Sequence, residues 1–153
     1  MMSNRTLEDI PIHNEDLEVQ PALPAIADFR SKVDGSDGIV IATPEYNHGM
    51  PGVLKNALDS ASRPAFASCF QSKPVLILSC APAFTGGVRA QHQLRETLSS
   101  MLAHIVPGRE IFVAGVNAKI SQGRFTGKDS LAFIAIGLYR LREEILNQRV
   151  FAL

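Results

Sequence analysis

Short apolar runs alternate along the chain with stretches in which apolar residues recur at helical spacing. The run 38–43 is β-branched and apolar throughout, which predicts a strand covered on both faces. The runs 74–79 and 111–114 predict two further strands, and the polar, glycine-containing segment 117–127 predicts a loop. Strands that alternate with helices predict an α/β fold with a parallel sheet.

Four helices are predicted from the apolar residues that would form their buried stripes. The first ends at Asp34-Gly35, and the second opens with Pro51, whose missing N–H would be unpaired there anyway. Pro107-Gly108 is predicted to break the third, and Asp129 or Ser130 to cap the fourth. In chain order the stripes are Leu23, Ile26, Phe29 and Val33; Val53, Leu54, Ala57, Leu58 and Ala61; Leu94, Leu98, Met101, Leu102 and Ile105; and Leu131, Ile134, Leu138, Leu141 and Ile145.

Composition narrows the function classes. A chain of 153 residues with 46% hydrophobic and 20% charged positions predicts one globular domain, residues 1–153, with a real core. Fifteen basic residues balance fifteen acidic ones, which argues against nucleic-acid or membrane-surface binding. No apolar stretch approaches the roughly 20 residues of a membrane span, and residues 1–9 do not resemble a signal peptide. Cys69 and Cys80 lack CxxC spacing, so we expect reduced thiols in a cytoplasmic protein.

Two loops follow the carboxyl ends of predicted strands, where ligands bind in open α/β sheets. In the second loop, Gly86-Gly87 permits a close approach of a ligand to the backbone. The helix that opens beside it would direct free N–H groups and its positive dipole end at the loop. Each loop also has a plain structural interpretation, in which Pro44 and Gly49 make a strand-to-helix turn and the glycine pair is a helix entry. The occurrence of both loops at matching strand ends favours a ligand site.

The run 43–59 carries a family resemblance. It reads TPEYN, then PGxLKNAxD opening a helix, and resembles the signature of NAD(P)H-dependent FMN reductases, the branch that includes quinone, chromate and azo-dye reductases. The similarity extends from about Leu7 to the final helix and includes 73–75 and 86–91. The resemblance implies a flavodoxin-like three-layer sandwich, FMN as cofactor and NAD(P)H as co-substrate. It also implies ping-pong hydride transfer to quinones or similar acceptors, in a homodimer or homotetramer.

The resemblance also implies which residues bind the flavin. One group would wrap the isoalloxazine and ribityl parts, and the other would lie by the pyrimidine end of the ring. No general acid or base is assigned, because the flavin performs the hydride chemistry. No metal site is expected, because His92 and Glu96, one helical turn apart, fall short of the three or four protein ligands of zinc. The cofactor-binding residues are Pro44, Glu45, Tyr46, Asn47 and His48 in the first group, and Ala81, Gly86 and Gly87 in the second.

Members of this family open with a buried strand and a Gly-Ser-x-Arg-x-x-Ser-x-Asn loop that holds the FMN phosphate. This chain begins near the family's second strand, and Ser3-Asn4-Arg5 is a poor substitute for that loop. The strand 38–43 is therefore expected to have an unpaired edge. Loss of several charge-assisted bonds would lower FMN affinity by several powers of ten. The chain is explained equally by a start upstream of Met1, by a fragment, or by a natural short paralogue completed by a partner.

Two other functions are considered. The chain could be a flavin-free, non-catalytic remnant that serves as an oligomerisation or interaction module. A hydrolase that uses Glu45 and His48 is disfavoured, because no Ser or Cys nucleophile elbow accompanies them. Asn56 and Asp59 are expected to bind backbone or partner groups, and Cys80 to be an ordinary thiol.

Overall fold

The computed structural model describes residues 7–17 and 22–151. Ser3-Asn4-Arg5 lies outside the described residues. The helices are α1 (Pro24–Asp34), α2 (Gly52–Ala61), α3 (Val88–Ser100) and α4 (Lys128–Phe151), with short 3-10 helices η1 (Leu7–Asp9), η2 (Glu15–Leu17) and η3 (Val116–Lys119). The strands are β1 (Ile39–Pro44), β2 (Pro74–Ala81), β3 (His104–Ile105), β4 (Ile111–Ala114), β5 (Ile120–Ser121) and β6 (Arg124–Phe125).

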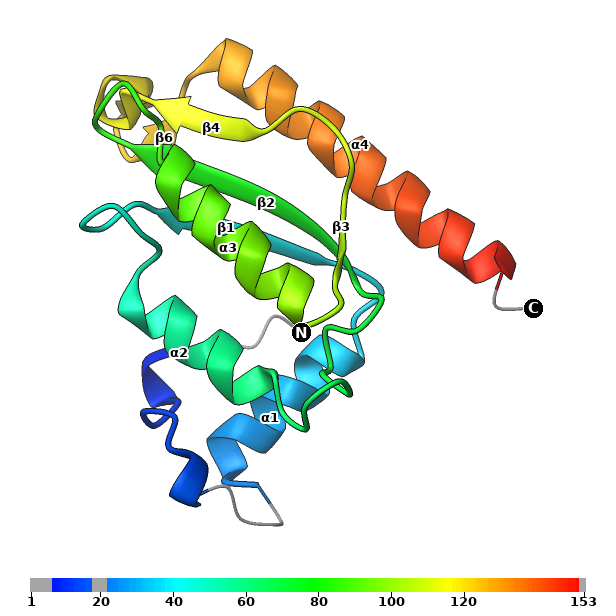
Figure 1. The fold of residues 1–153 in the computed structure, drawn as a ribbon. Helices are drawn as coiled ribbons and strands as arrows, with labels where there is room; N and C mark the ends of the chain where they lie inside the picture. The colour runs from blue at the N-terminus through cyan, green and yellow to red at the C-terminus, as the bar shows by residue number, and fades with distance from the viewer. Residues whose placement is uncertain (1–6, 18–21, 152–153) are drawn as a thin grey trace.

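A parallel sheet organises the fold, as the sequence predicted. β2 pairs with β1 on one side and with both β3 and β4 on the other, all in parallel. Within the described residues β1 pairs only with β2, so it is an edge strand of this sheet. Helices cover both faces of the sheet, and Figure 1 shows α3 lying across it.

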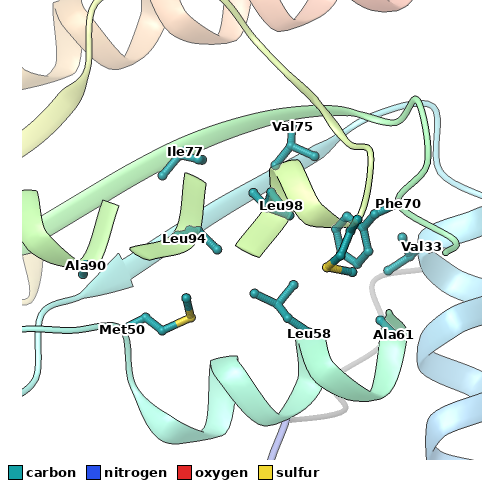
Figure 2. Close-up of a cluster of buried hydrophobic side chains, with 11 residues drawn as sticks. Val33, Met50, Leu58, Ala61, Phe70, Val75, Ile77, Ala90, Leu94 and Leu98 are labelled. Atoms are coloured by element: carbon teal, nitrogen blue, oxygen red, sulfur yellow. The ribbon is translucent and has the colours of Figure 1, made fainter. Parts of the chain in front are cut away.

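Alternation along β2 separates two hydrophobic clusters, because successive residues of a strand point to opposite faces. Val75 and Ile77 belong to the α3-side cluster, whereas Leu76 belongs to the α4-side cluster. Figure 2 shows the α3-side cluster filling the space between α2, α3 and the sheet. Its buried members are Val33, Met50, Leu58, Ala61, Phe70, Val75, Ile77, Ala90, Leu94, Leu98 and Met101. The α4-side cluster consists of Leu76, Val106, Ile111 and Leu141.

The prediction that the first strand is covered on both faces is wrong for the described residues. Ile39, Ile41 and Thr43 turn toward the helices α1 to α3 and are half-buried or buried. Val40 on the other face is 43% exposed, and Ala42 is also exposed. A uniformly apolar run indicates that both faces of a strand are suited to burial, but the elements that cover each face cannot be inferred from it.

The third helix ends earlier than predicted, at Ser100 rather than at Pro107-Gly108. Ala103 N–H donates to Leu98 O at 3.0 Å and Leu102 N–H to Ser99 O at 3.0 Å, the two bonds of a Schellman motif. Leu102 takes the left-handed position of this motif (φ 59°) and is 47% exposed. Ile105, predicted to continue the helical stripe, instead pairs with Val75 in strand β3.

The last helix and the loop before it also differ in detail from the prediction. α4 begins at Lys128, so Asp129 and Ser130 lie in its first turn rather than at its cap. The segment predicted as a polar loop contains η3 and the antiparallel hairpin of β5 and β6. No helix in residues 7–17 and 22–151 has the length and hydropathy needed to cross a membrane.

Candidate functional site

Three turns leave the same edge of the sheet, where the parallel strands end. The register places Thr43 opposite Ser79 and Pro44 opposite Cys80, and β2 runs on until Ala81 pairs with Ala114. The turns after β1, β2 and β4 therefore emerge side by side, as Figure 1 shows. This edge is where open α/β sheets bind ligands.

The first turn is a narrow hairpin at the tip of the TPEYN motif. Tyr46 N–H donates to Gly49 O at 2.9 Å, and Gly49 N–H donates to Tyr46 O at 3.0 Å. Asn47 and His48 between them both have positive φ, 46° and 67°, as in a type I′ turn. Positive φ is uncommon in residues other than glycine and marks local strain, which is often found at ligand sites. Tyr46 is 65% exposed, and the N–H groups of Asn47 and His48 meet no acceptor in the described residues.

Helix α3 contacts the first turn through hydrogen bonds and an ion pair. Arg89 N–H donates to Glu45 Oε2 at 3.0 Å, and Arg89 Nη1 lies 3.4 Å from Glu45 Oε1. Met50 N–H donates to Gln93 Oε1 at 2.8 Å. The Glu45 side chain is only 11% exposed, so its carboxylate faces the helix. The expectation that the N–H groups of this helix are free for a ligand needs correction, because Glu45 occupies one of them and offsets the positive end of the dipole.

The second turn contains Gly86 and Gly87, with φ of 61° and 88°. A Cβ on Gly86 would lie 3.0 Å from Phe112 Cβ, and one on Gly87 would lie 2.9 Å from Ser79 Cβ. Glycine is therefore required here by the packing of the protein itself, in addition to any approach of a ring. Ala81, assigned to the same ligand-facing group, is the last residue of β2 and its methyl group is buried.

A buried polar network lies behind the second turn. Gln91 Nε2 donates to Ser79 Oγ at 2.9 Å and to Ile111 O at 2.7 Å, while Ser79 Oγ donates to Gly86 O at 2.8 Å. Gln91 Oε1 is buried and meets no partner within the described part of the chain. Each of the two hydrogen bonds from Gln91 Nε2 stabilises the fold by about 0.5–1.5 kcal/mol net, and the unpaired buried Oε1 destabilises it by about 1–3 kcal/mol. These contributions nearly cancel, so stability alone does not explain an amide at this position.

Asn56, in the PGxLKNAxD motif, pins the N-terminal segment to α2. Its Nδ2 donates to Ile10 O at 3.2 Å and to Pro11 O at 3.0 Å, and its Oδ1 accepts from His13 N–H at 2.7 Å. The expectation that Asn56 binds backbone groups is confirmed. Asp59 instead pairs with Lys55 on the same helix, at 2.7 Å.

The structure brings the predicted residues to one edge of the sheet. None of the eight residues lines three surface hollows of about 370, 250 and 420 Å³, which lie at the opposite edge of the sheet or between α4 and β4. Two neighbouring features escaped the sequence interpretation. Phe84, in the second turn, is 90% exposed, and Gly115 N–H in the third turn donates to Ala83 O at 3.4 Å. The signal for both was their place just after a strand end.

These features fit the ring end of FMN. An exposed tyrosine beside unpaired N–H groups offers a stacking face and donors for the polar edge of a flat ring. The left-handed glycines keep side chains out of the second turn. The fit concerns the ring alone, because these turns present no group of donors of the kind that a phosphate needs.

Comparison with known proteins shows which family the chain is similar to. Residues 4–118 match the family described as NADPH-dependent FMN reductase. An NAD(P)H-dependent FMN reductase of Pseudomonas aeruginosa is 40% identical over 119 residues, 77% of this chain and 64% of the relative. A quinone reductase of Escherichia coli is 37% identical over 112 residues, 72% of this chain and 58% of the relative. The chain thus spans less than two thirds of the length of these curated relatives.

A solved structure shares the fold. The flavoenzyme NAD(P)H:(acceptor) oxidoreductase FerB from Paracoccus denitrificans superposes with a TM-score of 0.77 at 24% identity, covering 92% of this chain and 78% of that one. This agreement supports the predicted flavodoxin-like α/β sandwich.

Proposed function

Because the chain belongs to the NADPH-dependent FMN reductase family, we propose that it provides the flavin-ring end of an FMN-dependent NAD(P)H oxidoreductase. Hydride would pass from the nicotinamide through the flavin to quinones or similar acceptors. Residues 1–153 would belong to a single flavodoxin-like domain. The observation that carries the proposal is the parallel register of β1 and β2, which brings the TPEYN turn and the Gly86-Gly87 turn to one edge.

The residues of the two turns would have different tasks. Tyr46 would stack on the ring, and the N–H groups of Asn47 and His48 would bind its polar edge. Gly86-Gly87 would let the backbone approach from the other turn, while Pro44, Glu45 and Ala81 would fix the ends of the strands beneath. Bound FMN supplies the hydride chemistry, and the chain binds and orients it.

A flavin-binding titration tests this proposal with the chain's two tyrosines. Tyr46 lies at the proposed site, and Tyr139 on α4 is similarly exposed, at 65% and 61%. An aromatic contact contributes about 0.5–1.5 kcal/mol beyond its buried area. Tyr46→Ala should therefore weaken FMN binding by about tenfold, measured by quenching of flavin fluorescence. Tyr139→Ala should leave binding unchanged. Equal effects of the two substitutions would contradict the assignment.

A second function is favoured by one observation. Val40 on β1 and Leu131 and Leu138 on α4 are each more than 40% exposed, and such side chains are common at protein interfaces. In this alternative the chain is a flavin-free interaction module. A colourless protein that neither binds added FMN nor catalyses NAD(P)H-dependent quinone reduction would support it over the oxidoreductase.

The proposal also includes the oligomeric state of the protein, its location and its partners. We infer a homodimer or homotetramer in the cytoplasm, acting on a small-molecule acceptor without nucleic acid or membrane. The exposed apolar side chains of α4 support association. Light scattering during size-exclusion chromatography would measure the oligomeric state, and a purely monomeric profile at tens of micromolar would contradict it.

A further inference from the structure

Gln91 is a fully buried amide that joins three parts of the fold. It extends from α3, and its Nε2 donates to Ser79 Oγ on β2 and to the carbonyl of Ile111 on β4. Both acceptors are set in paired strands, so the direction of the amide is fixed.

Ser79 transmits this contact to the second turn. Its hydroxyl has one proton, which it donates to Gly86 O, and it accepts from Gln91 through a lone pair. The Gln91 amide therefore orients the hydroxyl toward the turn. A Cβ on Gly87 would lie 2.9 Å from Ser79 Cβ, so the same side chain also supports the second glycine.

The turn needs such support because a glycine has no strong preference for one backbone conformation. A glycine visits positive and negative φ about equally, and two glycines in succession leave a segment with many accessible states. The structure holds both at positive φ. The contributions of the Gln91 amide to stability nearly cancel, whereas its contact through Ser79 Oγ reaches the backbone carbonyl of Gly86 in the turn.

We propose that Gln91 is a positioning residue for the flavin site, resting on the function proposed above. Through Ser79 it holds Gly86-Gly87 in the conformation that receives the planar ring, while its own side chain touches no ligand. Removal of the amide would then loosen the turn and weaken flavin binding, although the surrounding core remains packed.

The first test uses the FMN-free chain, so that it does not depend on flavin binding. Gln91→Met keeps the length and apolar stem of the side chain, and Ser79→Ala removes a single hydroxyl. Each should raise amide hydrogen exchange at Gly86 and Val88, whose N–H groups donate to Ala83 O and Thr85 O at 3.3 Å each, by about tenfold. Exchange in the middle of α3 should be unchanged. Gln148→Met is the matched control, because Gln148 Nε2 also donates to a backbone carbonyl, Ser72 O, at the opposite edge of the sheet. Unchanged exchange in both site variants would overturn the proposal.

The second test measures FMN affinity in the same variants. Gln91→Met and Ser79→Ala should each raise the Kd by about tenfold and shift the absorption spectrum of the bound flavin. The double variant should show little more than either single change, because both act through one chain of bonds. Faster exchange with an unchanged Kd and spectrum would overturn the positioning role.

The two tests separate this inference from the proposed function. A wild-type chain that binds no FMN would overturn the proposed function, while faster exchange in the variants would still support the hold on the turn. Normal FMN binding with unchanged exchange and Kd in the variants would overturn this inference and leave the proposed function standing.

Discussion

The face of the sheet that α3 covers and the face that α4 covers bury very different numbers of apolar residues. Eleven buried residues form the α3-side cluster, but only four form the α4-side cluster of the described residues. On α4, Leu131 and Leu138, both predicted to be buried, are 46% and 45% exposed. Both turns of the candidate site are fastened to α3, through Arg89, Gln91 and Gln93. The site is therefore built on the well-packed face.

The largest expected difference between the faces is the cost of deleting a leucine. Leu94→Ala on α3 should destabilise the protein by about 2–5 kcal/mol, because Leu94 is completely buried. Leu138→Ala on α4 should change the free energy of unfolding by less than about 0.5 kcal/mol. Urea denaturation measures both. A Leu138→Ala cost as large as that of Leu94→Ala would mean that another molecule or segment covers the α4 face in solution.

A smaller effect is expected at Gly137 on α4, which packs against side chains of β2 and β4. A Cβ on Gly137 would collide with Ile111 Cδ1 and lie 3.2 Å from Leu76 Cδ1. Overpacking in Gly137→Ala should lower the free energy of unfolding by about 1–3 kcal/mol. The higher helix propensity of alanine should offset about 1 kcal/mol of this loss. Gly52→Ala is the control, because a Cβ there meets no atom within 4 Å. It should stabilise by about 0.4–1 kcal/mol. A stabilising Gly137→Ala would show that the α4 face is loosely packed throughout.

A further difference concerns charge at the start of α3. Glu45→Gln keeps an acceptor for Arg89 N–H but removes the negative charge, which should cost about 0.3–1 kcal/mol. The cost should shrink in 1 M salt, because salt screens the interaction. Glu143→Gln on α4 is the control, since Glu143 pairs with its exposed neighbour Arg142. Denaturation at two salt concentrations distinguishes the variants, and a salt-independent loss would exclude the charge effect.

The smallest effect is expected at alkaline pH. Burial raises the pKa of the Cys69 thiol above its ordinary value of 9.0, although nearby Arg30 acts in the opposite direction. The native state therefore holds the proton more tightly than the unfolded state, and stability falls as the pH rises through 9. Cys69→Ala should lose less stability than wild type as the pH rises through 9. Parallel pH profiles of the two proteins would contradict the shift.

Sequence periodicity predicted the elements well where packing is local. The strand at 111–114 was placed correctly, and Leu94, Leu98 and Leu141 are buried as expected. The early end of α3 could not be predicted, because Leu102 adopts a left-handed conformation that glycine usually supplies. The exposure of Val40 was equally unpredictable, since coverage depends on what lies opposite.

The candidate site was predictable as a place but not as a set of contacts. Both turns lie at the predicted edge because strand polarity follows directly from the alternation of strands and helices. The hydrogen bond from Arg89 N–H on α3 to the Glu45 carboxylate depends on the distance between two elements separated by more than forty residues in the sequence. Spacing in the sequence contains no such information, and Gln91 was likewise indistinguishable from an ordinary helix-surface glutamine.

The pairing of Thr43 with Ser79 has a consequence for how this protein can change over time. Each residue advances a strand by about 3.3 Å, so one insertion within β1 would lift the tyrosine tip by that distance and exchange the two sides of every side chain beyond it. Insertions past Pro44 would spare the ladder. Insertions and deletions among descendants of this sequence should therefore occur in the hairpin, and the number of residue pairs between β1 and β2 should stay constant.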